Sequence, residues 1–174
     1  MLIDYKGEIE VGDLIFTFKR GNLFSRLIWF FGGAPPQLKV SHVAIYIGEG
    51  LIAEMSFGGL GITGLRKYSV NKYVVHIGRI KIEYDVDSVI AGIKEQVGAR
   101  KYSYIQIGII LLKKLFGSHV KNDVDGDAAM CSEFIVEILR THGKIDILPG
   151  IYSWDAEPLG IIQSEFIDFW KIAA

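Results

Sequence analysis

The chain has 174 residues, and its 19 Lys and Arg residues balance 20 Asp and Glu residues to a formal net charge of -1. This length predicts one compact domain over residues 1–174, and the balanced charge argues against nucleic acid as a partner. The longest charge-free apolar stretches are too short for a membrane-spanning helix, and charged residues near the N-terminus interrupt any apolar signal segment. We therefore expect a cytoplasmic protein whose contact with a membrane would be peripheral.

The first half of the chain is dominated by segments typical of β-strands. β-branched and aromatic residues favour extended structure, whereas the apolar spacing before the Gly-Gly-Ala-Pro-Pro sequence favours a helix. The expected elements, in chain order, are a strand over 13–18, a helix over 22–31, and strands over 42–47, 51–55 and 72–80.

The second half changes to a helical period. Helices are expected from residue 87 to Gly98, over about 104–115, and from just after Asp127 to Gly143. Asp87 or Ser88 can cap the first of them. Because strands come early and helices late, without regular alternation, the pattern predicts an α+β domain with a mainly antiparallel sheet packed against helices.

Cys131 is the single cysteine, so no disulfide can form within the chain. It is expected in the first turns of its helix, four residues beyond the capping candidate Asp127. Free backbone N–H groups and the positive end of the helix dipole favour a thiolate at this position, and a thiolate is the nucleophilic form. The alternative is a buried structural cysteine that packs beside Phe134 and Ile135.

His42 is the best-placed candidate base among the four histidines. It opens a predicted strand, where a side chain can face a cleft, whereas His76 lies in the middle of a strand and His119 lies in a loop. His142 is eleven residues after Cys131, about 16 Å along a helix, which is too far to serve that thiol.

Glu54 is the candidate that would orient the histidine. If residues 48–50 form a three-residue hairpin loop, Ile47 pairs with Leu51 and Ala44 pairs with Glu54. Glu54 then shares a sheet face with the candidate base. A two-residue loop would place it on the opposite face, and an ordinary solvated position is the alternative.

Four short motifs occur in the order seen in one known family. They are residues 12–16 (Gly-Asp-Leu-Ile-Phe), 41–45 (Ser-His-Val-Ala-Ile), 52–54 (Ile-Ala-Glu) and 131–135 (Cys-Ser-Glu-Phe-Ile), with a weaker match at 157–159. The chain resembles the circularly permuted papain-like hydrolases of the NlpC type, and its motifs are most similar to the YiiX/YebB-like bacterial branch. This resemblance implies a permuted papain-like fold with the nucleophile at the N-terminus of a helix.

The resemblance also implies roles: Cys131 as nucleophile, His42 as base and Glu54 as the residue that orients the imidazole. The expected activity is cleavage of a small-molecule or peptide amide, related to cell-wall peptides in one version, through an acyl-thioester and without a cofactor or metal. One alternative is a lipid-directed acyl hydrolase or acyltransferase of the same fold. The other is a ligand-binding module that retains the fold without catalysis.

The oxyanion donor differs from the family pattern. Relatives often carry an aromatic residue just before the cysteine, but this chain has Met130 there. Tyr46 or Tyr102 could supply a phenolic donor instead, and Met130 remains a candidate substrate contact. Farther along, Lys113 and Lys114 follow an apolar run that could touch lipid, although a packed helix with solvated lysines is the more ordinary explanation.

Overall fold

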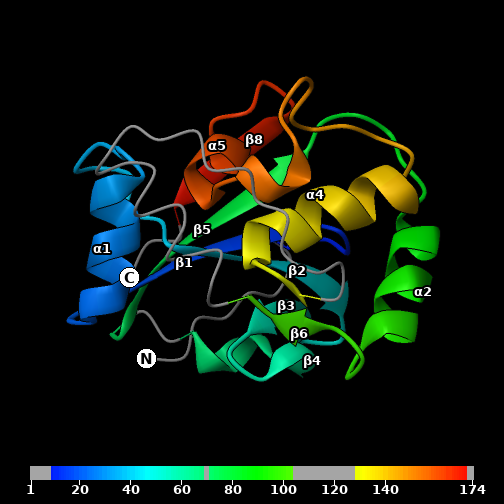
Figure 1. Cartoon of the computed structure of the whole chain (residues 1–174), viewed down its shortest axis with the longest axis horizontal. Coiled ribbons are helices and arrows are strands. Elements are labelled where there is room, and N and C mark those ends of the chain that lie inside the picture. Colours follow the sequence, from blue (N-terminus) through cyan, green and yellow to red (C-terminus); the bar gives the residue numbers. More distant parts are fainter. Residues whose placement is uncertain (1–8, 69–70, 104–127, 172–174) are drawn as a thin grey trace.

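A six-stranded antiparallel sheet forms the centre of the molecule (Figure 1). The computed structural model describes residues 9–68, 71–103 and 128–171. The strand order is β4-β3-β2-β1-β5-β8. The strands are β1 (Leu14–Lys19), β2 (His42–Gly48), β3 (Leu51–Ser56), β4 (Gly59–Gly64), β5 (Tyr73–Ile80) and β8 (Ile167–Lys171).

Helices pack against this sheet. The described helices are α1 (Leu23–Phe31), α2 (Val86–Gln96), α4 (Cys131–Thr141) and α5 (Pro158–Ile162), with 3-10 turns η1 (Leu65–Lys67) and η2 (Ser153–Asp155). A short parallel pair, β6 (Lys101–Tyr102) with β7 (Ala128–Ala129), leads into α4. Helix α4 packs on β2 and β3, while α1 and α2 lie on opposite sides of the molecule (Figure 1).

The predicted α+β class with a mainly antiparallel sheet is confirmed. Every strand and helix expected before residue 100 is present, with ends that differ by one or two residues. Asn22 caps α1 because its Oδ1 accepts the Ser25 N–H at 2.9 Å. Strands β4 and β8 and helix α5 were not predicted. The helix expected over about 104–115, including the two lysines at 113 and 114, lies outside the described residues.

Two predicted helix caps are wrong. Helix α2 is capped by Asp85, whose Oδ1 accepts the Ser88 N–H at 2.9 Å, so the helix begins before both expected capping residues. Helix α4 begins at Cys131 itself with Met130 as its N-cap, rather than after Asp127. The reason is that residues 128–129 pair with β6 as strand β7, and this extended conformation delays the helix.

The core lies mainly between the sheet and α4. Val43, Ile45 and Met55 face this side and are fully buried. The predicted apolar stripe of α4 is confirmed, since all of its members are buried: Cys131, Phe134, Ile135, Ile138 and Leu139. A smaller cluster on the opposite face of the sheet joins Ala44, Ile52 and Tyr68.

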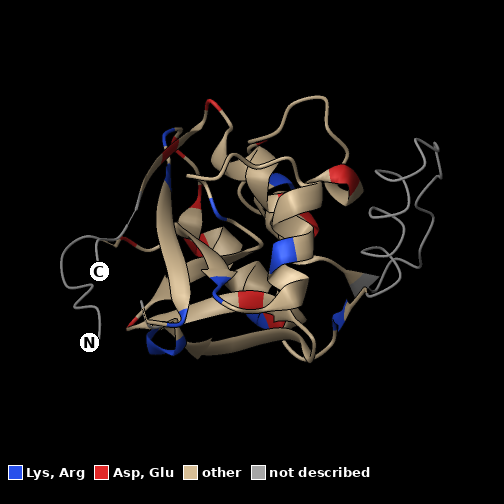
Figure 2. Ribbon diagram, turned by 90° about the vertical axis from the view of Figure 1, so that its left-hand side faces the viewer, with Lys and Arg blue, Asp and Glu red and all other residues tan. Residues whose placement is uncertain are grey.

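Charged residues of both signs are interspersed over the described elements (Figure 2). This distribution agrees with the near-zero net charge. Among the described helices, none has the length and apolar character required to cross a membrane.

Candidate active site

A β-bulge places Glu54 on the same sheet face as His42. The β2–β3 hairpin turns through only two residues, Glu49 and Gly50, both with positive φ. Gly48, not Ile47, pairs with Leu51, so the expected three-residue loop and its first pair are wrong. A register shift between Tyr46 and Gly48 adds one residue on β2. The bulge thereby restores the alternation that a two-residue loop would have inverted.

A hydrogen bond joins the side chains of Glu54 and His42. The Nε2 atom of His42 lies 2.9 Å from Oε2 of Glu54. Glu54 is only 4% exposed, whereas the His42 side chain is 22% exposed. Lys67 donates to Oε1 of the same carboxylate and the Tyr68 hydroxyl donates to Oε2. Three donors therefore hold the buried carboxylate in one orientation and compensate for its burial.

Cys131 occupies the first residue of α4, next to the first residues of β2. The residue is 6% exposed and lies beside the His42 ring, whose charge acts to lower the pKa of the thiol. The backbone N–H groups of Val43 and Ser132 also act to lower this pKa. Because Nε2 of His42 faces Glu54, Nδ1 is the ring nitrogen available to the thiol. The order is therefore carboxylate, imidazole, thiol.

The electrostatics favour an ion pair between the thiol and the imidazole. Burial opposes charge on His42, but the Cys131 thiolate and then Glu54 outweigh it and raise the histidine pKa to about 9. Burial likewise opposes charge on Cys131, yet the charge and hydrogen bond of His42 lower the thiol pKa. The helix N-terminus acts in the same direction. A lowered pKa increases the fraction of thiolate, which is the nucleophilic form of cysteine.

Two cavities flank this pair. The first is lined by Cys131 but not by His42. The second is lined by His42 and Glu54 but not by Cys131. Both share three wall residues: Ile28 of α1, Ser41 just before β2, and Tyr102 of β6. Cys131 and His42 therefore line different cavities, which adjoin at these three shared residues.

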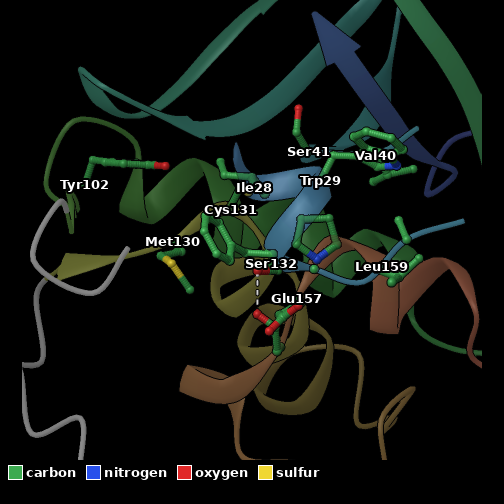
Figure 3. A pocket seen from close by; sticks show the side chains of 15 residues that line it. Ile28, Trp29, Val40, Ser41, Tyr102, Met130, Cys131, Ser132, Glu157 and Leu159 are labelled. Atoms are coloured by element: carbon green, nitrogen blue, oxygen red, sulfur yellow. Dashed lines mark hydrogen bonds between the residues drawn. The ribbon is translucent and has the colours of Figure 1, made fainter. Parts of the chain in front are cut away.

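The cavity on the Cys131 side is mainly apolar (Figure 3). Helix α1 contributes Ile28 and Trp29, and the start of α5 contributes Leu159. The Ser132 hydroxyl donates to the Ala156 carbonyl at 2.7 Å, which ties the first turn of α4 to the segment that forms the opposite wall. Among the described residues that line this cavity, Glu157 is the one acid.

The oxyanion candidates lie in different places. Tyr102 lines both cavities, and Met130 lines the Cys131-side cavity (Figure 3). Tyr46 lines neither, because its hydroxyl accepts the Gly50 N–H at 3.0 Å in the hairpin turn. The Met130 N–H donates to Glu133 Oε2 at 3.1 Å and is therefore engaged.

Lys67 and Tyr68, which bind the Glu54 carboxylate, were not predicted from the sequence. They lie in and just after the 3-10 turn η1, thirteen and fourteen residues beyond Glu54, in a segment with no helical or strand period. A basic and an aromatic residue side by side are common on protein surfaces. No local signal distinguishes this pair, since only the packing of η1 against β3 brings them to the carboxylate.

The described fold and site define a class: a mixed α+β domain, consistent with a papain-like fold, that carries a thiol–imidazole–carboxylate arrangement. One solved structure to which it is similar is that of the metalloprotein YiiX from Escherichia coli O157:H7, with a TM-score of 0.66. The match covers 95% of this chain and 98% of that chain at 13% sequence identity. This similarity shows a YiiX-like fold. No family model matches the chain, and no curated protein matches its sequence.

A metal site is not apparent in the part of the chain that the structure describes. Within those residues, no group of three or more His, Cys, Asp or Glu side chains is arranged to hold a metal ion. Glu54 and Cys131 each interact with the His42 ring that stands between them, so these three side chains form a series. Ligands of one metal ion would instead converge on a common centre.

Proposed function

We propose that the protein is a thiol-dependent acyl hydrolase of the amidase or peptidase kind. Cys131 is the nucleophile, His42 is the base and then the acid, and Glu54 orients the imidazole. The observation that carries the proposal is the order carboxylate, imidazole, thiol, with the pKa of the thiol lowered and that of the imidazole raised. Such shifts at the rim of a cavity are typical of functional sites.

The reaction proceeds in two steps. The Cys131 thiolate attacks the substrate carbonyl carbon and forms a C–S bond, and the carbonyl oxygen becomes an oxyanion near the N–H groups of the first turn of α4. The bond to the leaving group then breaks as the His42 imidazolium gives its proton to the departing amine. In the second step His42 takes a proton from water, which attacks the thioester and releases the acid and the thiolate.

Thiol alkylation tests the ion pair directly. Because Cys131 is the single cysteine, the mass added by iodoacetamide reports this thiol alone. We expect Cys131 to react faster than glutathione near neutral pH and His42→Ala to slow it at least tenfold. A thiol that reacts like glutathione, and equally fast in His42→Ala, would contradict the proposed ion pair and favour a binding module without catalysis.

A substrate panel tests the activity. Amides, esters and thioesters with the same acyl group are compared, with Cys131→Ala as the blank. The proposal expects turnover that is lost in the blank. Turnover that survives in Cys131→Ala would exclude Cys131 as the nucleophile.

A second candidate function is hydrolysis or transfer of a long apolar acyl group. The observation that favours it is the apolar lining of the Cys131-side cavity, where the walls of α1 and α5 present Trp29, Phe31 and Leu159. If the substrate carries a long acyl group, we expect kcat/KM to rise with acyl length from acetyl to octanoyl. This rise should be weaker in Leu159→Gln. The absence of any dependence on acyl length would argue against it.

A further inference from the structure

We propose that the cavity on the His42 side binds the leaving group, and that it selects a leaving amine that carries a carboxylate. This inference rests on the proposed hydrolase function and deepens it. Its observations are the division of the thiol and the imidazole between two cavities and the charges that line the second one.

The chemistry of the reaction decides which cavity receives the leaving group. Cys131 lines the Cys131-side cavity and His42 lines the His42-side cavity. The leaving nitrogen must receive its proton from the His42 imidazolium, so it must lie on the side that this ring lines. The acyl carbon forms its bond to the Cys131 sulfur. A substrate would therefore extend from one cavity to the other where they adjoin, at Ile28, Ser41 and Tyr102, with its acyl part on the thiol side.

Charged side chains distinguish the His42-side cavity. Lys19, at the end of β1, and Lys67, in η1, both line the His42-side cavity. Glu54 is the single acid among the described residues of its lining, and its oxygens already accept from His42, Lys67 and Tyr68. With the thiolate and the imidazolium offsetting each other, the two lysines exceed this one carboxylate. The cavity is thus net cationic.

Lys67 can serve both the carboxylate and a ligand. An ammonium group has three N–H donors, and Glu54 Oε1 accepts from one of them. The Lys67 side chain is 37% exposed, so its remaining donors can reach the cavity. Lys19 is exposed and shares this cavity wall. Hydroxyl groups of Thr17, Ser56 and Tyr73 line the same space and suit a polar leaving group.

The Cys131-side cavity has the opposite character. Its lining includes no lysine or arginine among the described residues, and Glu157 is its charged member. An anionic group would be disfavoured there and favoured on the His42 side. The two cavities therefore orient a substrate whose acyl part is apolar and whose amine part is anionic, which is the chemistry of an N-acylated amino acid.

The test uses two amides with the same acyl group. N-octanoylglycine and N-octanoylglycinamide differ only in the carboxylate of the leaving amine. We expect kcat/KM to be about tenfold higher for the carboxylate. Lys19→Gln and Lys67→Gln should each lower this ratio about threefold, whereas Lys67→Arg should restore most of it. Lys94→Gln, an exposed lysine on α2 away from both cavities, is the matched control and should leave the ratio unchanged.

A second measurement requires no turnover. Iodoacetate and iodoacetamide alkylate Cys131 with the same chemistry, but only iodoacetate is anionic. We expect the alkylation rate with iodoacetate, divided by the rate with iodoacetamide, to fall in Lys19→Gln and to stay constant in Lys94→Gln. The Glu54 carboxylate accepts from His42, Lys67 and Tyr68. Replacing Lys19 leaves these three donors in place, so its effect reports the charge of the cavity and not the orientation of His42.

The outcomes separate the two proposals. Turnover with a ratio of one or less overturns the leaving-group inference while the hydrolase proposal stands. A ratio above one that both lysine variants leave unchanged overturns the assignment to Lys19 and Lys67. If neither amide nor any ester or thioester is cleaved and Cys131 reacts like glutathione, the hydrolase proposal fails and this inference fails with it.

Discussion

Replacing Glu54 with Gln probes how far the carboxylate governs the imidazole. The change keeps the shape of the side chain but removes the negative charge 2.9 Å from His42 Nε2. A hydrogen bond to a charged group contributes about 1.5 to 3 kcal/mol, and about 1.4 kcal/mol corresponds to one pH unit. Burial lowers the pKa of His42, and Cys131 and Glu54 together raise it to about 9. In Glu54→Gln we expect this pKa to fall by about 1 to 2 pH units.

The neighbouring lysine acts in the same direction. Once Glu54 is neutral, the Lys67 charge is no longer offset, and it further disfavours an imidazolium. The thiolate–imidazolium pair exists between the lowered pKa of Cys131 and the raised pKa of His42. A lower histidine pKa therefore narrows, from the alkaline side, the pH range in which the pair exists.

The assay is an NMR titration of the His42 ring, assigned by comparison with His42→Gln. The midpoint should move from about 9 in the wild type to a value lower by about 1 to 2 pH units in Glu54→Gln. Glu83→Gln, which removes an exposed acid away from the site, should leave the midpoint in place. An unchanged midpoint in folded Glu54→Gln would refute the reasoning, since the carboxylate would then contribute nothing to the charge of the imidazole.

Three further predictions concern stability. Arg79→Ala removes two hydrogen bonds, of 2.9 and 2.8 Å, from the Asp13 carboxylate, which is 3% exposed, and should lower the urea-derived free energy of unfolding by about 2 to 4 kcal/mol. Gly92→Ala would place its Cβ 2.4 Å from the His142 ring, so overpacking should lower the same free energy by about 1 to 3 kcal/mol. Burial raises the pKa of Glu54, but its donors outweigh burial and lower it from 4.5 to about 2. Its contribution to stability should therefore be complete above pH 4.5 and disappear as the pH falls through about 2, as measured by circular dichroism.

Each of these predictions has a matched control. Arg66→Ala changes an exposed arginine and should leave stability within about 0.5 kcal/mol of the wild type. Gly160→Ala adds a Cβ that meets no atom within 4 Å, so it should not destabilise the protein. Glu54→Gln should remove the acid-dependent step. Equal effects in test and control variants would mean that the named contacts do not carry the stability assigned to them.

Local sequence was sufficient for the elements that carry the site. The side chain of Asn22 can cap only the residues directly after it, and the apolar spacing from Cys131 to Leu139 admits only one buried helical face. The strand that begins at His42 could likewise be predicted from its β-branched residues. These patterns depend on neighbours within one or two turns. They hold whatever the rest of the fold does.

Strands β4 and β8 could not be predicted from the local sequence. Strand β4 reads Gly-Leu-Gly-Ile-Thr-Gly, and its three glycines have little strand propensity of their own. It is extended because all six of its residues pair with β3. Strand β8 lies at the sheet edge and is defined by its pairing with β5, more than 80 residues earlier. Pairing over such separations leaves no local pattern.

By itself, the sequence determined that a thiol stands at a helix start and that a histidine opens a strand, because both follow from local periodicity. Tertiary structure alone decided that these groups meet. It also decided which face Glu54 occupies, since one bulged residue reverses the outcome of the turn, and it brought Lys67 and Tyr68 to the carboxylate. The division of thiol and imidazole between two cavities is likewise tertiary. The walls of these cavities come from segments that share no sequence pattern and meet only through packing.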